Sequence, residues 1–316
     1  MSFNRIALYG HRGWATDRIA AALFASGAPI TVLHRPGSNT SAVPANIPKI
    51  EVDLLDTDAL VKALQNVDIV ISLVGADVEK EYGFVKAIPL TNIKLFVASD
   101  LSLQYGEEGN RIAILKAKDD LQRAIRAAGI PMTRVLTGNF AEFTLGCCGM
   151  GIDLARNRLV HTANSANEKA NMAYVQNTRE YVGAAYVSIF TANDISEIQN
   201  RTISLTELAP TGNEIAAAMT KKHGKEPEII VHSLEKVQAA FDDSLKAGVP
   251  AAAAWFYRKI WGTGELMAML SSDVWDVPGY RKATLDDLIV SGKIGKYRDL
   301  PDSVVTYVED TMFQAL

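Results

Sequence analysis

The beginning of the chain joins an apolar strand, a glycine turn and a helix, and this combination restricts the fold more than any other feature. Residues 6–9 are apolar and strand-like, Gly10 and Gly13 follow, and a helical pattern covers residues 17–26. Glycines here allow a tight turn and a close approach of the backbone to a ligand. Because N–H groups at a helix N-terminus attract anions, the turn predicts a site for the pyrophosphate of a dinucleotide.

This turn matches the dinucleotide fingerprint incompletely. Thr16 stands where a third glycine, used for helix packing, is expected. An ordinary strand-to-helix turn therefore stays open as an alternative. Arg12 either adds a phosphate contact or lies in solvent. The cofactor contacts expected from this turn are Gly10, Arg12, Gly13, Trp14 and Ala15.

The end of the second predicted strand, residues 29–33, indicates which dinucleotide is preferred. NAD-binding proteins usually carry an acid at this tip, which accepts a hydrogen bond from the ribose 2′-hydroxyl. This chain has His34 and Arg35 there instead. The planar guanidinium of Arg35 suits a 2′-phosphate, so the sequence favours NADP(H) over NAD(H), with both residues as contacts.

Strand-like and helix-like segments alternate through the first 140 residues, which predicts a parallel sheet with helices on both faces. We expect a Rossmann-type α/β fold over residues 1–145 and a smaller, less regular substrate region over 146–316, partly interleaved with the first. Leu73 and Val74 end the fourth strand and Ser99 follows the fifth, so we expect cofactor contacts there. The further strands are expected at 49–54, 68–74, 94–98 and 132–136, and the helices at 59–66, 78–87 and 115–128.

The second half has shorter, mixed segments, at 159–162, 178–191 and 202–205, followed by helices at 212–224, 233–247 and 250–270. Ligands of such folds bind over the carboxyl ends of the strands, so this half is expected to complete a substrate pocket. Successive helical side chains diverge, so at most two of the three neighbouring aromatics at 255–257 can reach a ligand. A role in the core or in a subunit interface is the alternative. The expected substrate contacts are Phe140, Phe143, Trp255, Phe256 and Tyr257.

Composition narrows the classes of partner. The formal net charge is −4, which argues against nucleic acid or an anionic membrane as a partner. No apolar stretch reaches the roughly 18 residues of a membrane span and no signal-peptide pattern is present, so we expect a cytoplasmic protein. The adjacent Cys147 and Cys148 provide no disulfide framework, and the five histidines lack ligand spacing, so no metal is expected. The sequence leaves a homodimer open.

The order and spacing of several short segments resemble the NmrA-like and isoflavone-reductase-like branch of the atypical short-chain dehydrogenase/reductases, with the character of its fungal members. The resemblance implies a Rossmann fold, bound NADP(H) and reduction of a small, aromatic or heterocyclic secondary metabolite. It is carried by Gly10-x-x-Gly13, Leu33-x-Arg35 and residues 52–54, 68–72, 93–100, 118–125, 129–133, 138–140, 200–203, 211–215 and 284–288.

The resemblance also implies a catalytic residue. Reductases of this family carry a lysine on the helix after the fifth strand, eleven residues before the glycine of a Gly-Ile-Pro turn, and Lys118 has this offset from Gly129. Such a lysine binds the nicotinamide ribose and supplies a proton or polarises a carbonyl. Without the resemblance, Lys118 would be interpreted as a solvated helix lysine. Asn139 and Phe140 are expected at the nicotinamide edge.

The chain departs from the family pattern at four positions around the cofactor: Arg12, Thr16, Pro89 and Ala98. Two other functions therefore stay open beside the reductase. One is a redox sensor that binds the dinucleotide without turnover. The other is a non-redox rearrangement in the same pocket. Retention of Lys118 argues mildly against the sensor.

Overall fold

Five parallel strands form the central sheet of the first half of the chain. The computed structural model describes residues 3–173 and 179–314. The strand order is β3-β2-β1-β4-β5. The order reverses direction between β1 and β4, and such a reversal opens a crevice at the carboxyl ends of the strands. The strands are β1 (Ile6–Tyr9), β2 (Ile30–His34), β3 (Lys49–Glu51), β4 (Ile69–Ser72) and β5 (Leu95–Val97).

The sixth predicted strand extends this sheet through a short link. β6 (Arg134–Leu136) pairs in parallel with β11 (Thr202–Ser204). The Phe96 N–H donates to the Pro131 carbonyl at 2.9 Å, and the Phe96 carbonyl accepts from the Thr133 N–H at 3.1 Å. The predicted Rossmann-type α/β fold is therefore confirmed, with a crossover order typical of dinucleotide-binding sheets.

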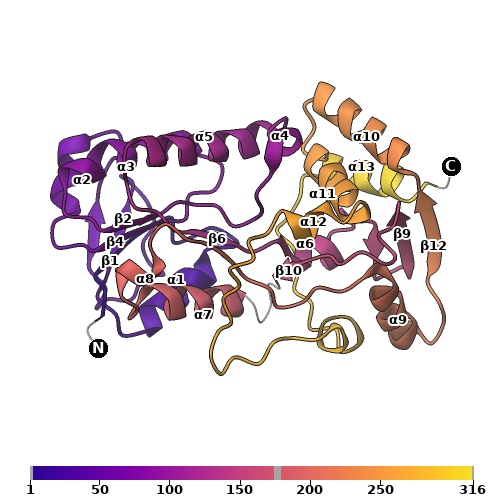
Figure 1. Cartoon of the computed structure of the whole chain (residues 1–316). Helices are drawn as coiled ribbons and strands as arrows, with labels where there is room; N and C mark the ends of the chain where they lie inside the picture. Colours follow the sequence, from indigo (N-terminus) through magenta and orange to yellow (C-terminus); the bar gives the residue numbers. More distant parts are fainter. Residues whose placement is uncertain (1–2, 174–178, 315–316) are drawn as a thin grey trace.

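Helices cover both faces of the sheet because its strands are apolar on both sides (Figure 1). Ile6 and Leu8 of β1 belong to the core under one face, whereas Ala7 and Tyr9 belong to the core under the other. The first face carries α1 (Asp17–Ala25), α7 (Arg179–Phe190) and α8 (Ile195–Ile198), and the second carries α2 (Thr57–Ala63), α3 (Tyr82–Ala87) and α5 (Ala113–Ala127).

Helix α7 shows that the chain returns to the first half after leaving it. A Cβ atom at Gly183 would lie 2.8 Å from the Arg18 carbonyl oxygen, so glycine lets α7 approach α1 closely. Tyr186 and Phe190 fill the core against this face. The segment expected at 178–191 corresponds to α7, although Thr178 lies outside the described residues.

A second, mainly helical region lies beside the sheet (Figure 1, right). It contains a small sheet of order β12-β9-β8, and two of its helices begin at polar caps: α9 at the capping box of Thr211 and Glu214, and α10 at Ser233. Its elements are β8 (Ile152–Asp153), β9 (Arg158–Thr162), β12 (Glu228–His232), α9 (Gly212–His223), α10 (Leu234–Lys246), α11 (Ala252–Gly262), α12 (Glu265–Ala268), η3 (Asp286–Val290) and α13 (Asp302–Met312).

Short elements connect the two regions near the carboxyl ends of the strands. β7 (Asn139–Phe140) pairs with β10 (Met172–Ala173) and leads directly into α6 (Ala141–Gly146). The remaining short elements are η1 (Val78–Glu81), η2 (Ile88–Leu90), which holds Pro89, and α4 (Gly106–Gly109).

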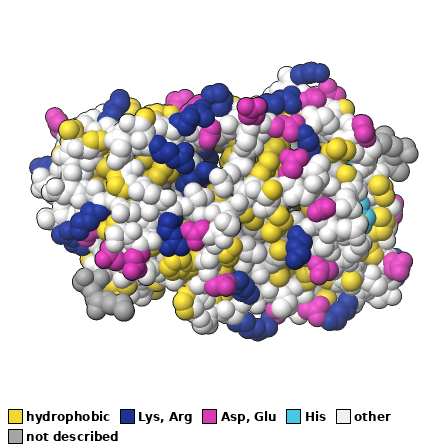
Figure 2. All heavy atoms as spheres, in the orientation of Figure 1, with side chains coloured by type: hydrophobic (Ala, Val, Ile, Leu, Met, Phe, Trp, Pro, Cys, Tyr) yellow, Lys and Arg dark blue, Asp and Glu magenta, His cyan; other side chains and the backbone are white. Residues whose placement is uncertain are grey.

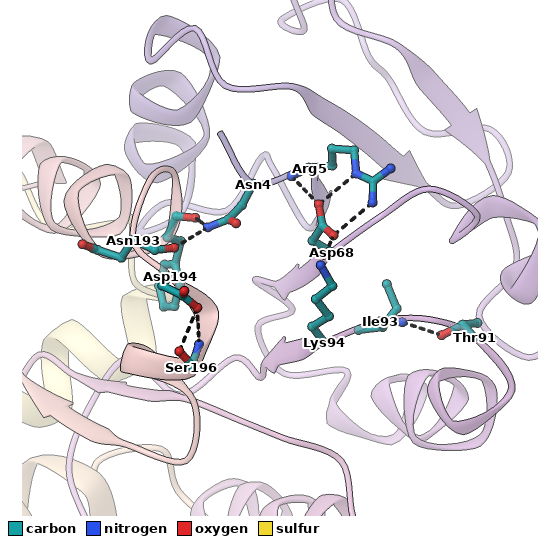
Figure 3. A network of polar contacts seen from close by, with 10 residues as sticks. Asn4, Arg5, Asp68, Thr91, Ile93, Lys94, Asn193, Asp194 and Ser196 are labelled. Carbon is teal, nitrogen blue, oxygen red and sulfur yellow. Dashed lines mark hydrogen bonds and ion pairs between the residues drawn. The ribbon is translucent and has the colours of Figure 1, made fainter. Parts of the chain in front are cut away.

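The opposite edge of the sheet, at the amino ends of the strands, is held by polar contacts (Figure 3). Asp68 precedes β4 and accepts from the Arg5 side chain at 2.8 Å and from Lys94 at 3.0 Å. The hydrogen bond from Arg5, reinforced by Lys94, keeps the pKa of Asp68 well below its usual range. Asn4 donates to the carbonyls of Phe190 and Asn193, which ties α7 to the same edge. This edge therefore stabilises the fold and leaves the carboxyl ends for ligands.

On the face of the molecule that Figure 2 shows, basic and acidic side chains are interspersed. In the described part of the chain, no helix combines the length and the apolar character that crossing a membrane requires.

Candidate functional site

Two adjoining pockets lie along the carboxyl ends of the central strands. The first has a volume of about 280 Å³ and lies over β1, β2 and β4. The second has a volume of about 570 Å³ and extends from β4 and β5 towards α6 and α11. Leu73, Val74 and Gly75, which follow β4, line both. An elongated ligand can therefore continue from one pocket into the other.

The glycine turn forms the floor of the first pocket. Gly10 has a φ of +92°, and a Cβ atom there would lie 2.7 Å from the backbone of Leu73. Thr16 closes the turn from within: its Oγ1 accepts from the Gly13 N–H at 2.9 Å and donates to the Gly10 carbonyl at 2.8 Å. The departure at Thr16 thus has a structural role, because its hydroxyl fixes the turn that a third glycine would leave unbraced.

Cationic side chains surround the first pocket. Arg12, Arg35 and Lys80 line it, and Asp77, its acidic lining residue, forms an ion pair with Lys80 at 2.7 Å. The Nε2 of His11 is buried without a hydrogen-bond partner among the described residues. Burial, with repulsion from Arg12, lowers the pKa of His11, so its ring is neutral near pH 7. This donor set suits a phosphate-bearing ligand.

Lys118 stands at the inner end of the second pocket. Its Nζ donates to the Ser99 carbonyl at 2.7 Å, and Ser99 in turn donates its hydroxyl to the Val74 carbonyl. Lys116, two residues earlier on α5, is exposed and pairs with Asp120 at 2.6 Å. The helix therefore directs Lys118, and not Lys116, into the pocket.

Aromatic rings form a continuous wall along the second pocket. Trp14 meets Phe140 at a centroid distance of 5.4 Å and Tyr297 at 4.9 Å. Phe143 links Tyr297, at 5.8 Å, to Tyr257, at 5.7 Å. Edge-to-face and tilted pairs of this kind add about 0.5–1.5 kcal/mol each beyond simple burial. The wall suits a flat, apolar ligand.

Three hydroxyl-bearing side chains lie together along this wall. The Ser102 hydroxyl and the Tyr257 hydroxyl are 2.8 Å apart, and Tyr105 lines the pocket beside them. Burial raises the pKa of Tyr257, so its hydroxyl keeps its proton. Asn139 is buried, and its Nδ2 has no hydrogen-bond partner among the described residues. These groups offer a few directional contacts to a ligand.

The structure distributes the predicted site residues over the two pockets as follows. Trp14 lines neither pocket and supports the wall through Phe140. The first pocket is lined by Gly10, Arg12, Gly13, His34 and Arg35, both pockets by Leu73 and Val74, and the second by Ala15, Ser99, Lys118, Asn139, Phe140, Phe143 and Tyr257.

Two predicted substrate contacts lie elsewhere and are corrected. Trp255 and Phe256 are buried in the core of the second region and line neither pocket. The Trp255 Nε1 donates to the Tyr307 hydroxyl at 3.0 Å, and Phe256 packs on Phe241. Consecutive helical residues point about 100° apart, so α11 presents Tyr257 to the pocket and turns its two neighbours inward.

Part of the site was not predicted by any sequence pattern. The segment before α13 contributes Tyr297, Arg298 and Leu300 to the second pocket, and no motif marks these residues. Ser102 and Tyr105 follow β5 by a few residues, and their position after a strand was the one available clue.

Cys147 lines the second pocket as a neutral thiol. Burial raises the pKa of Cys147 to about 12, so the thiol is protonated at neutral pH. Among the described residues, no group of three or more potential ligands is arranged to hold a metal ion.

The NmrA-like family model matches residues 3–256. The chain belongs to the NmrA-like family. Among similar NmrA-like and related reductases is the phenylcoumaran benzylic ether reductase IRL1 of Ginkgo biloba, 28% identical over 267 residues, which are 78% of this chain and 81% of that protein. The bifunctional pinoresinol-lariciresinol reductase of Forsythia intermedia is 26% identical over 273 residues, 76% of this chain and 82% of that protein. Both come from plants, so the fungal character stays a prediction.

Solved structures with the same fold include two that bear on this NmrA-like chain. A crystal structure of isoflavone reductase has a TM-score of 0.75 at 25% identity, covering 92% of this chain and 99% of that one. The structure of AtPrR2 with NADP+ and (+)-pinoresinol has a TM-score of 0.76 at 20% identity, again covering 92% and 99%. At such identity the second likeness carries the fold alone.

Proposed function

We propose that this NmrA-like protein is an NADPH-dependent reductase of a small aromatic or heterocyclic metabolite. The observation that carries the proposal is the position of Lys118, whose ammonium is held by the Ser99 carbonyl where the two pockets meet. The reductases named above support the same activity.

The first pocket fits the nucleotide part of NADP(H). The Gly10–Gly13 turn lines this pocket and packs closely on the backbone after β4, where a side chain at Gly10 would collide. Glycine turns of this kind let the backbone approach the phosphates of a dinucleotide. Arg35 and Arg12 would hold the 2′-phosphate and its neighbours by charge-assisted hydrogen bonds. Leu73 and Val74 line both pockets, so the cofactor would pass over them towards Lys118. Asn139 and Phe140 would then lie at the nicotinamide edge.

The chemistry follows from what each group supplies. Bound NADPH supplies a hydride to an electrophilic carbon of the substrate. Lys118 donates a proton to the oxygen or nitrogen on which negative charge develops. Ser99 fixes the direction of that ammonium, and the aromatic wall holds the substrate and excludes water.

The second pocket also indicates the substrate class. Its wall is aromatic and its polar groups are few. None of the described residues that line it is acidic, so a cationic substrate lacks a partner there. Flat phenolic compounds, such as the isoflavones and benzylic ethers in the names of the relatives, fit this pattern best.

The proposal is tested by titration with NADPH, followed by a turnover screen with isoflavones, phenylcoumarans, lignans, aromatic enones and imines. We expect tight NADPH binding and substrate-dependent loss of absorbance at 340 nm. Binding without turnover of any compound would favour the sensor. Conversion of a substrate without net consumption of NADPH would favour the non-redox rearrangement.

A further inference from the structure

A buried carboxylic acid lies directly behind the Lys118 site and has no role in the chemistry described so far. Glu81 ends η1 and precedes α3, at the carboxyl side of β4 and β5. Its exposed fraction is 0%. Its Oε1 accepts from the Ser99 N–H at 3.3 Å, and its Oε2 has no hydrogen bond within 3.5 Å among the described residues, although the nearby Ser72 hydroxyl favours its charged form. A carboxylate buried so incompletely satisfied is costly, which calls for a functional explanation.

Ser99 connects this acid to the lysine. Its N–H binds Glu81, its hydroxyl binds the Val74 carbonyl, and its own carbonyl accepts from Lys118. The three contacts fix Ser99 from three directions. A change at Glu81 therefore acts on Lys118 through one shared residue as well as through space.

The two ionisable groups also interact by charge. Burial raises the pKa of Glu81 to about 7, the Ser72 hydroxyl and then the positive charge of Lys118 oppose that rise, and Asp100 adds to it. Lys118 faces Glu81 from α5, Asp100 from the loop after β5, and Asp100 is itself paired with Arg134 at 2.6 Å. On its own element, Lys80 is occupied by Asp77. Lys118 is thus the cation that favours the charged form of Glu81.

We propose that Glu81 is a positioning residue of the reductase: it holds Ser99 in place, and through the Ser99 carbonyl it keeps the Lys118 ammonium directed at the reacting atom. The inference rests on the proposed role of Lys118. The negative charge of ionised Glu81 also attracts that ammonium. Below pH 7 Glu81 takes up a proton, and this attraction is lost.

The test compares Glu81→Gln with the wild type over pH 5.5–9.5. Glutamine keeps an oxygen that accepts from the Ser99 N–H, and it removes the charge. We expect the two kcat/KM profiles to coincide below about pH 6, where wild-type Glu81 is also neutral. Above pH 7 we expect kcat/KM of the variant to fall about tenfold below the wild-type value, because the neutral amide no longer attracts the Lys118 ammonium and holds it in place. Glu79→Gln, an exposed position on the same element, is the matched control and should leave the profile unchanged.

A second measurement does not depend on turnover. The infrared band of the protonated Glu81 carboxyl, identified by its loss in Glu81→Gln, should disappear with a midpoint near pH 7. In Lys118→Met that midpoint should move upwards. A folded Glu81→Gln variant with the wild-type kcat/KM profile would overturn the proposal. The same infrared midpoint in Lys118→Met as in the wild type would overturn it too. If no substrate is ever turned over, the proposed function fails, and the infrared titration still decides whether the two groups are coupled.

Discussion

The two pockets that we assign to the nucleotide and to the substrate of this NmrA-like protein are built in different ways. The first is made from turns that immediately follow β1, β2 and β4, and it is lined by a glycine turn and by cations. The second is assembled from α5, α6, α11 and the segment before α13, which are far apart in the sequence. We therefore expect cofactor affinity to depend on local turns and substrate choice to depend on packing between distant segments.

The largest expected effect on binding is a loss of NADPH affinity. In Gly13→Val, the new Cβ would lie 2.7 Å from the Thr16 Oγ1 and disrupt the bonds that brace the turn. We expect the disrupted turn to lose two charge-assisted hydrogen bonds to the pyrophosphate, of about 1.5–3 kcal/mol each. NADPH binding should therefore weaken by about 100-fold or more. Calorimetry measures this effect, and circular dichroism confirms folding. A folded variant with wild-type NADPH affinity would show that the phosphates bind elsewhere.

A smaller effect sharpens the choice between the two dinucleotides. Arg35→Ala should reduce the preference for NADPH over NADH by about ten- to hundredfold, because the guanidinium no longer meets a 2′-phosphate. Arg126→Ala, an exposed arginine on α5 away from both pockets, is the control. An unchanged ratio of the two dissociation constants in Arg35→Ala would contradict the assignment.

The smallest effect concerns the substrate side alone. Tyr257→Phe removes a hydroxyl that lines the substrate pocket beside Ser102, and loss of one hydrogen bond to the substrate should raise KM by about two- to tenfold. NADPH affinity should stay the same. Tyr307→Phe makes the same chemical change outside the pocket, where the hydroxyl binds Trp255, and should leave KM unaltered. Equal KM changes in the two variants would show that Tyr257 makes no specific contact with the substrate.

The sequence was informative where function depends on local order. The strand, glycine turn and helix at the start, the cation at the tip of β2, and the alternation through residue 140 predicted the sheet and the residues at its carboxyl ends. Each of these signals is read from short, contiguous segments of the chain. The periodicity of buried strands and the absence of an acid after β2 are visible without tertiary contacts.

The rest depends on contacts that no local pattern records. The closing wall formed by Tyr297 and its neighbours needs the chain after α12 to fold back over Trp14 and Phe143. The aromatics of α11 were predictable as a group, but their division between core and pocket depends on how the helix is rotated against its neighbours. Glu81 was hidden for a related reason: nothing in the sequence distinguishes it from the exposed Glu79.

We have proposed that Lys118 performs chemistry where the two pockets meet, and a comparison of two lysine variants tests this role. We would compare kcat and NADPH affinity in Lys118→Met and Lys116→Met, two lysines on one helix of which one faces the pocket. Removal of a positioned general acid should lower kcat by about 10²–10⁴-fold in Lys118→Met, with a much smaller loss of NADPH affinity, while Lys116→Met stays at the wild-type rate. A Lys118→Met enzyme with near-normal kcat on its substrate would contradict the account.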